Sequence, residues 1–236
     1  MRKAIKRVAD KTLGVPMRAF MRNCIVNPLF RLNYKTTIVG SEHAFSCTDG
    51  AIVVSNHVSY MDGPFLMNEA WPFARMRATT WYKEYKKHRF LMWLFSVVPL
   101  GSPSELHEDE RARRKKNSMD IMNRILRASQ LLLIFAEGSI GDGATVKVDQ
   151  RLTGVHDLIH NNPDKPILMV RIEGLERSHF GRVKDKSARR GRLPVTITIE
   201  RFDNVSLDGG CRALNERIAQ YFNDRKPIPT VERQIA

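Results

Sequence analysis

Short apolar runs that alternate with longer helical patterns are the feature that most constrains this fold. Three such runs cover Ala51–Ser55, Leu131–Phe135 and residues 167–172, and each is apolar along nearly its whole length. A strand without polar alternation is typical of a sheet that is covered on both faces. The sequence therefore predicts an α/β fold with a mainly parallel central sheet flanked by helices.

The other predicted elements complete this alternation. Further strands are expected over residues 36–39, 77–81 and 195–199. Helices are expected over residues 83–97, 108–128, 152–160 and 213–222. In open parallel sheets, ligands bind outside the carboxyl ends of the strands. This rule directs the search for a site to residues 56–62, 136–139 and 171–174.

The first 35 residues are unusually basic, with nine Lys or Arg against one acid, Asp10. They predict one or two basic amphipathic helices, interrupted near Gly14 and Pro16, that lie on a membrane surface. The longest apolar run, residues 90–100, is about half of the roughly 20 residues that span a bilayer. We therefore expect a helical segment over 1–35, a main domain over 36–224 and a tail over 225–236, on the cytoplasmic face of a membrane.

Composition excludes some classes and leaves others open. The 236-residue chain has three cysteines without a close pair, which argues against a disulfide framework or a zinc cage and suits a reducing compartment. The formal net charge of +14 could attract nucleic acid, anionic lipid headgroups or an acidic protein. Charge alone does not choose among these partners.

His57 and Asp62 are the candidate catalytic pair, because they follow the first buried run. Imidazole suits a general base near neutral pH, and a carboxylate on its other ring nitrogen fixes the tautomer. On a regular helix five residues leave two side chains about 140° apart, so the backbone must bend between them. The turn-forming residues Asp62, Gly63 and Pro64 permit such a bend. A capping or core role for His57 is the alternative.

Three blocks in the expected order carry a family resemblance. Residues 56–63, NHVSYMDG, resemble the N-H-x-x-x-x-D block of the glycerophospholipid acyltransferase superfamily, and residues 135–138, FAEG, resemble its F-P-E-G block. Residues 170–174 and 178–180 are similar to the last motif region of one branch. That branch is the acyltransferase half of bacterial 2-acylglycerophosphoethanolamine acyltransferase/acyl-carrier-protein synthetase. The resemblance runs from about residue 36 to 222.

The resemblance implies both a fold and a reaction. It implies a glycerol-3-phosphate acyltransferase-like domain that moves a fatty acyl group from acyl-CoA or acyl carrier protein to a lysophospholipid hydroxyl. His57 would be the general base and Asp62 its charge partner, without a covalent acyl-enzyme. Glu137 and Gly138 would bind the acceptor, together with the neighbouring Ser139. No metal or cofactor is expected.

Departures from the family pattern concern the acceptor's phosphate. Ser139 and Ile140 stand where an arginine commonly follows the glutamate-glycine pair, and residues 98–102 lack the arginine that often ends that block. Lys147 and Arg171 are candidates to replace them, since either cation can form charge-assisted bonds to phosphate. For Arg171 the alternative is a structural ion pair with Glu173 or another neighbour.

Two further basic clusters are candidate interaction surfaces. Cations and aromatic rings alternate over residues 81–93, as in helices that lie at a membrane interface. Residues 111–116 form a second cluster that could dock acyl carrier protein or the phosphates of coenzyme A. Both segments could instead be ordinary solvated helix faces.

Two rival functions remain at this point. A nucleic-acid-binding protein would account for the charge but leaves the three strand-end blocks without explanation, so no nucleic-acid partner is expected. A hydrolase would use water in place of the alcohol, but no serine stands in a G-x-S-x-G pattern.

Overall fold

A seven-stranded sheet forms the centre of the computed structural model, which describes residues 14–69, 76–101, 107–150, 152–183, 191–203 and 205–224. The strand order is β1-β7-β6-β2-β5-β3-β4. Their bounds are β1 Tyr34–Val39, β2 Ala51–Ser55, β3 Met76–Trp81, β4 Val98–Leu100, β5 Leu131–Phe135, β6 Ile167–Glu173 and β7 Leu193–Arg201. Neighbouring strands pair in parallel, except β6 and β7. The predicted mainly parallel α/β sheet is confirmed.

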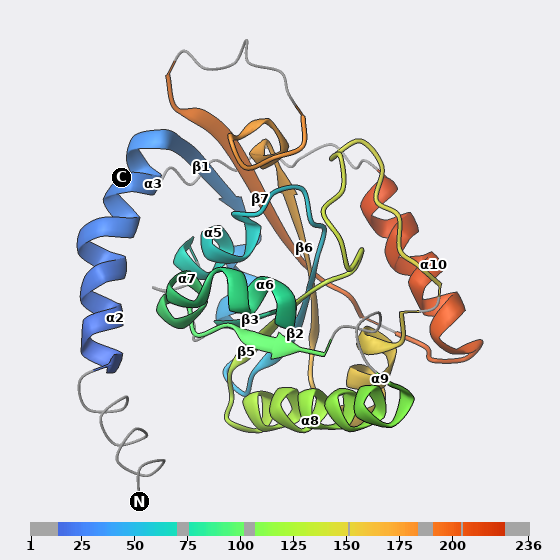
Figure 1. Cartoon of the computed structure of the whole chain (residues 1–236). Coiled ribbons are helices and arrows are strands. Elements are labelled where there is room, and N and C mark those ends of the chain that lie inside the picture. Colours follow the sequence, from blue (N-terminus) through green and yellow to red (C-terminus); the bar gives the residue numbers. More distant parts are fainter. Residues whose placement is uncertain are drawn as a thin grey trace, which may run out of the picture.

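Helices cover both faces of this sheet (Figure 1). On one side lie α2 Val15–Met21, the π-helix η2 Arg22–Val26, α3 Asn27–Asn33, α5 Asp62–Glu69, α6 Tyr82–Lys87 and α7 Arg89–Leu94. On the other lie α8 Glu108–Arg127, α9 Gly154–Asn161 and α10 Gly210–Asn223. Short helices α4 Ser41–Phe45 and η3 Leu175–Arg177 follow β1 and β6.

The sheet separates two apolar cores. Val53, Phe65 and Leu133 belong to the core beneath α3, α5 and α7, whereas Val54 and Leu132 belong to the core beneath α8, α9 and α10. Every residue of β2 is fully buried, as expected for a strand without polar alternation. No helix in the described ranges combines the length and apolar character needed to cross a bilayer.

The structure corrects two of the expected elements. The helix predicted over 83–97 is two helices separated at His88, whose φ of −118° and ψ of 40° are not helical, and the chain then re-enters the sheet as β4. Residues 62–64, which were expected to form a turn, instead begin helix α5 at Asp62. Pro64 fits the first turn of α5, where a missing N–H costs nothing.

At the N-terminus the chain is helical from Val15 to Asn33, so it continues past Pro16, which occupies the first turn of α2. The expected helical character is confirmed there, and the break near Gly14 and Pro16 is not found within the described residues. The predictions for residues 1–13 and for the tail 225–236 fall outside the described residues.

Candidate active site

The three predicted segments lie at or just after the carboxyl ends of β2, β5 and β6, which are neighbours in the sheet. Ser55, the last residue of β2, is paired with Phe135 of β5 and Val170 of β6. Asn56 extends this alignment, because its side-chain Nδ2 donates to the Ile172 carbonyl at 2.9 Å and its Oδ1 accepts the Ile172 N–H at 2.8 Å. The residue before His57 is therefore fixed to β6, a role that sequence reasoning missed.

His57 and Asp62 meet across the predicted bend. His57 Nδ1 lies 2.8 Å from Asp62 Oδ2, which also accepts the backbone N–H groups of Val58 at 2.6 Å and Ser59 at 2.8 Å. Asp62 is fully buried at the first position of α5. Burial raises the pKa of Asp62, and the three N–H donors oppose that rise. These three contacts orient the Asp62 side chain toward His57.

The ring of His57 is packed on its face, in addition to the Asp62 contact at its Nδ1. It stacks on Phe135 with 4.1 Å between ring centroids and 17° between ring planes. A carboxylate at Nδ1 favours the tautomer with the proton on that nitrogen, which leaves a lone pair on Nε2. Within the described residues Nε2 has no hydrogen-bond partner, and the side chain is 19% exposed. The arrangement presents one basic nitrogen to an incoming group.

Glu137 and Gly138 lie directly beside His57. Glu137 Oε2 accepts the backbone N–H of His57 at 2.8 Å, and the carboxyl group is buried. Burial raises the pKa of Glu137, while the backbone N–H groups of His57 and Lys147 lower it. Gly138 has a φ of 64°, in the left-handed region that favours glycine, and its carbonyl accepts Trp81 Nε1–H at 2.9 Å. Ser139 is exposed next to them.

Comparison with known families decides the class of protein. A family model described as Acyltransferase matches residues 13–171, which is more than half of the chain. The chain belongs to the acyltransferase family. The match includes His57, Asp62 and the whole of residues 135–138. No curated protein matches the chain.

The two cations expected to replace the family's arginines occupy different places in this acyltransferase. Lys147 is exposed on the loop after β5, close enough for its backbone N–H to contact Glu137. Arg171 lies on the opposite face of the sheet, where its Nη2 donates to the carbonyls of Tyr221 at 2.6 Å and Asp224 at 3.2 Å. Alternation along β6 explains this, since its neighbours Val170 and Ile172 face the core beneath α5. Arg171 therefore does not join His57.

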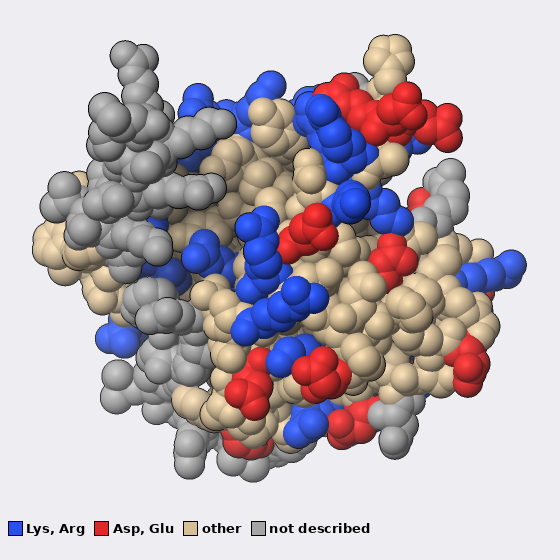
Figure 2. Space-filling model, turned by 90° about the horizontal axis from the view of Figure 1, so that it is seen from below, with Lys and Arg blue, Asp and Glu red and all other residues tan. Residues whose placement is uncertain are grey.

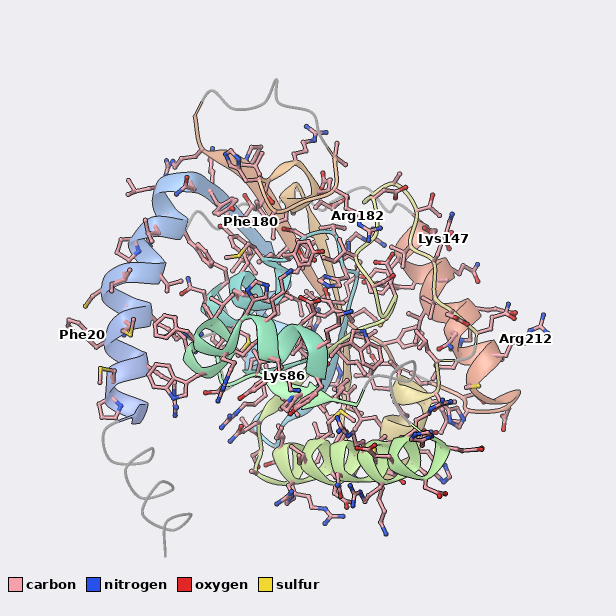
Figure 3. The ribbon with its side chains drawn as sticks, viewed as in Figure 1. Phe20, Lys86, Lys147, Phe180, Arg182 and Arg212 are labelled. Atoms are coloured by element: carbon pink, nitrogen blue, oxygen red, sulfur yellow. The ribbon has the colours of Figure 1, made fainter. Side chains whose placement is uncertain are left out.

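Residues 178–180, which resemble part of the last family motif, join the site after β6, although none of them was predicted as a site residue. Ser59 Oγ lies 3.2 Å from Ser178 Oγ, and the Tyr60 N–H donates to the Phe180 carbonyl at 3.2 Å. Tyr60 is 60% exposed and Phe180 is 50% exposed. Figure 3 shows Phe180 and Arg182 together in the upper part of the molecule. The candidate site thus has exposed aromatic side chains, Tyr60 and Phe180, at its border.

The basic cluster of α8 carries mixed charge. Lys115 Nζ pairs with Asp157 at 2.8 Å, and Arg114 pairs with Glu110 at 2.9 Å while lying over the Tyr82 ring of α6. Figure 2 shows Lys and Arg side chains gathered on the face seen from below, with Asp and Glu side chains among them. Part of the cluster is therefore neutralised within the protein.

Proposed function

We propose that this acyltransferase moves a fatty acyl group from an acyl thioester to the hydroxyl of a lysophospholipid or a related lipid, with His57 as general base. The observation that carries the proposal is the 2.8 Å contact of His57 Nδ1 with the buried Asp62, which leaves Nε2 as the one basic atom of the cluster facing outward. A general base needs a ring nitrogen that is open to the hydroxyl proton of its substrate, and Nε2 has no hydrogen-bond partner among the described residues.

In the proposed reaction, Nε2 removes the proton of the acceptor hydroxyl while its oxygen attacks the thioester carbonyl carbon. The tetrahedral intermediate collapses, the C–S bond breaks, and the thiolate takes the proton back from the imidazolium. An ester and a free thiol result. Asp62 stabilises the imidazolium through Nδ1–H, as a carboxylate does in other imidazole-based acyl transfer. No covalent acyl-enzyme is formed.

For the acceptor's phosphate we propose Lys147 and Arg182 as the binding cations. Both side chains are exposed, and both residues adjoin atoms that contact the site: Lys147 through its backbone N–H to Glu137, and Arg182 next to Gly181, which bridges to Ser59. Figure 3 shows both in the upper part of the molecule. Charge-assisted bonds from these cations would replace those of the missing arginines.

We also propose that the N-terminal helix lies on an anionic membrane surface. Five large apolar side chains are exposed on it: Met17, Phe20, Ile25, Leu29 and Leu32. A π-helix closes i→i+5 hydrogen bonds, so η2 lets the five-residue step from Phe20 to Ile25 span about one turn and keeps the apolar stripe continuous. Figure 3 shows Phe20 pointing away from the rest of the protein. Such a stripe beside cations is typical of interfacial helices.

Two arginines attach this helix to the catalytic body. Arg22 donates to the Met67 carbonyl of α5 and lies 5.0 Å from the Phe95 ring centroid, and Arg18 lies 5.4 Å from that of Trp93. Burial lowers the pKa of Arg22 to about 10. The proposed membrane surface is therefore joined to α5, which begins with Asp62.

The donor remains either acyl-CoA or acyl carrier protein. The cations of α6 and α8 are the proposed docking surface for its phosphates or acidic groups. The two helices adjoin, because Arg114 of α8 lies over the Tyr82 ring of α6, which Lys86 also contacts. Tyr82 follows Trp81, which binds the Gly138 carbonyl, so this surface adjoins the candidate site.

The test is transfer by the purified protein. It is incubated with labelled acyl-CoA or acyl carrier protein donors and a panel of lysolipids, and products are identified by mass. We expect a diacyl product, and a loss of about 10²–10⁴-fold in rate for His57→Ala. Normal turnover by His57→Ala would overturn the assignment. Release of free fatty acid with every lysolipid would indicate a hydrolase.

Membrane binding is tested separately by flotation with anionic liposomes. We expect Phe20→Ser combined with Leu32→Ser to weaken binding, while Phe45→Ser, an exposed aromatic of α4, serves as the matched control. Equal flotation of all three proteins would remove the helix from the proposed surface.

A further inference from the structure

One loop, residues 136–141, binds the backbone of His57 at both its N–H and its carbonyl group. At its beginning, Glu137 Oε2 accepts the His57 N–H at 2.8 Å. At its end, the Gly141 N–H donates to the His57 carbonyl at 2.6 Å. The loop is itself attached to β2, because the Ala136 N–H donates to the Ser55 carbonyl at 2.9 Å. The backbone of the proposed base therefore depends on this loop.

We propose that Glu137 is a positioning residue, which acts through the backbone of His57 and does not serve as a ligand of the acceptor. This inference rests on the proposed role of His57 as the base. It concerns a different property of the site, namely how the imidazole is held in a productive place.

The surroundings of the carboxylate favour this role over substrate binding. Glu137 is 8% exposed, and its Oε2 is occupied by the His57 N–H. Its Oε1 lies against Gly141, where an added Cβ would come within 2.6 Å of that oxygen. An acceptor hydroxyl would have to displace one of these neighbours, and leaving a buried N–H unpaired costs about 1–3 kcal/mol. Ser139 is exposed, so an acceptor hydroxyl could contact it without displacing a buried neighbour.

Charge gives the carboxylate a second effect on the base. The interaction between Glu137 and a charged His57 ring favours the ionised carboxyl group. A negative charge beside the ring attracts the positive charge that the ring gains when Nε2 takes the hydroxyl proton. Removing the charge therefore disfavours the proton-accepting step even where the backbone remains in place.

Gly141 supplies an independent way to disturb the same contact. An alanine here would push against Glu137 Oε1 while leaving every charge in the site unchanged. Gly154, at the start of α9, offers a matched control, because its added Cβ would meet only Ile134 Cδ1 at an ordinary 3.6 Å. The two glycine variants differ in whether they crowd the carboxylate.

The experiment measures kcat and the acceptor KM for Glu137→Ala, Glu137→Gln, Gly141→Ala and Gly154→Ala, with melting curves for each. Displacing a catalytic group by about 1 Å can cost about 10²-fold in rate. We expect kcat to fall about 100-fold in Glu137→Ala and clearly in Gly141→Ala, with the acceptor KM within about twofold of wild type. Glu137→Gln should recover part of the rate, because an amide oxygen still accepts the His57 N–H. Gly154→Ala should match wild type.

A tenfold or larger rise in acceptor KM at unchanged kcat in Glu137→Gln would overturn the inference and make Glu137 an acceptor ligand. Unchanged kcat in Gly141→Ala would overturn it as well, and that variant keeps the test valid if Glu137→Ala does not fold. Absence of any transfer by wild type would instead remove the proposed function. The two failures are therefore distinguishable.

Discussion

The ends of β2 and β6 each place an ionisable side chain among partners, and they do so with opposite results. After β2, the His57 ring receives one carboxylate at Nδ1 and keeps Nε2 open. On β6, the Arg171 guanidinium donates to two carbonyls and lies 5.4 Å from the Tyr221 ring centroid. One arrangement leaves a reactive atom available, and the other uses its charge to hold α10. A charged residue near a strand end is thus a candidate for chemistry only if its partners leave a reactive atom accessible.

The chemical type of the partner explains the difference. A carboxylate fixes the tautomer of an imidazole and leaves the far nitrogen basic. The last carbonyls of a helix lack intrahelical partners, and a cation there satisfies them and complements the helix dipole. Tyr221 adds a link to β7 through its hydroxyl, which donates to Glu200 Oε2 at 2.5 Å. Arg171 therefore joins β6, β7 and α10.

The largest expected effect follows from Asp62→Asn. An amide can present an N–H to Nδ1, which would favour the wrong tautomer and place a proton on Nε2. We expect kcat to fall by about 10³–10⁴-fold with little change in the acceptor KM, in line with the loss known for such substitutions in serine proteases. Steady-state kinetics check this, with circular dichroism as the control for folding. A rate within threefold of wild type would contradict the account.

Arg171→Met should show the reverse pattern. Loss of the guanidinium leaves the Tyr221 and Asp224 carbonyls without this donor, and hydrogen bonds to charged groups contribute about 1.5–3 kcal/mol. We expect a lower free energy of unfolding in urea by about that amount, with kcat and acceptor KM of the folded protein near wild type. A raised acceptor KM without loss of stability would return Arg171 to the phosphate site.

Phe135→Leu should produce a smaller change on the catalytic side. The stacked rings of His57 and Phe135 lie 4.1 Å apart, and aromatic pairs contribute about 0.5–1.5 kcal/mol beyond buried area. We expect kcat to fall by up to about tenfold, because the ring keeps its Asp62 contact but loses its support. A fall as large as that of Asp62→Asn would show that stacking, and not the carboxylate, fixes the imidazole.

The smallest expected effect is a pH dependence of stability. Burial raises the pKa of Asp62 in the folded protein above its unfolded value. The stability that this group contributes is therefore complete below the unfolded pKa and is lost as pH rises through the folded pKa. Between the unfolded and the folded pKa of Asp62, the free energy of unfolding of wild type should fall with rising pH relative to that of Asp62→Asn. Denaturation curves across that pH range measure the difference, and a constant difference would contradict the assigned shift.

The strands and the contact between His57 and Asp62 could be predicted because their signals are local. β2 and β5 begin and end where their apolar runs do, and His57 and Asp62 are five residues apart. The break at His88 could not be predicted, because residues 82–94 are compatible with one helix. The short strand β4 pairs with β3, and this tertiary contact decides the path of the chain there.

The partners of Glu137 and Arg171 lay beyond the sequence for a different reason. The His57 backbone is 80 residues away from Glu137, and the Tyr221 carbonyl is 50 residues away from Arg171. A backbone N–H or carbonyl is the same in nearly every residue type, so no sequence motif indicates which of them a side chain will bind. The resemblance assigned Glu137 to the acceptor, whereas the structure places its Oε2 on the N–H of His57.

The proposed reaction requires that Nδ1 of His57 carries the ring proton and that Nε2 carries the lone pair. Long-range ¹H–¹⁵N NMR of the histidine side chains, recorded where the rings are neutral and assigned with His57→Gln, measures this directly. The account predicts a protonated Nδ1 and an unprotonated Nε2 in wild type, with this preference lost in Asp62→Asn. A wild-type ring with its proton on Nε2 would contradict the account.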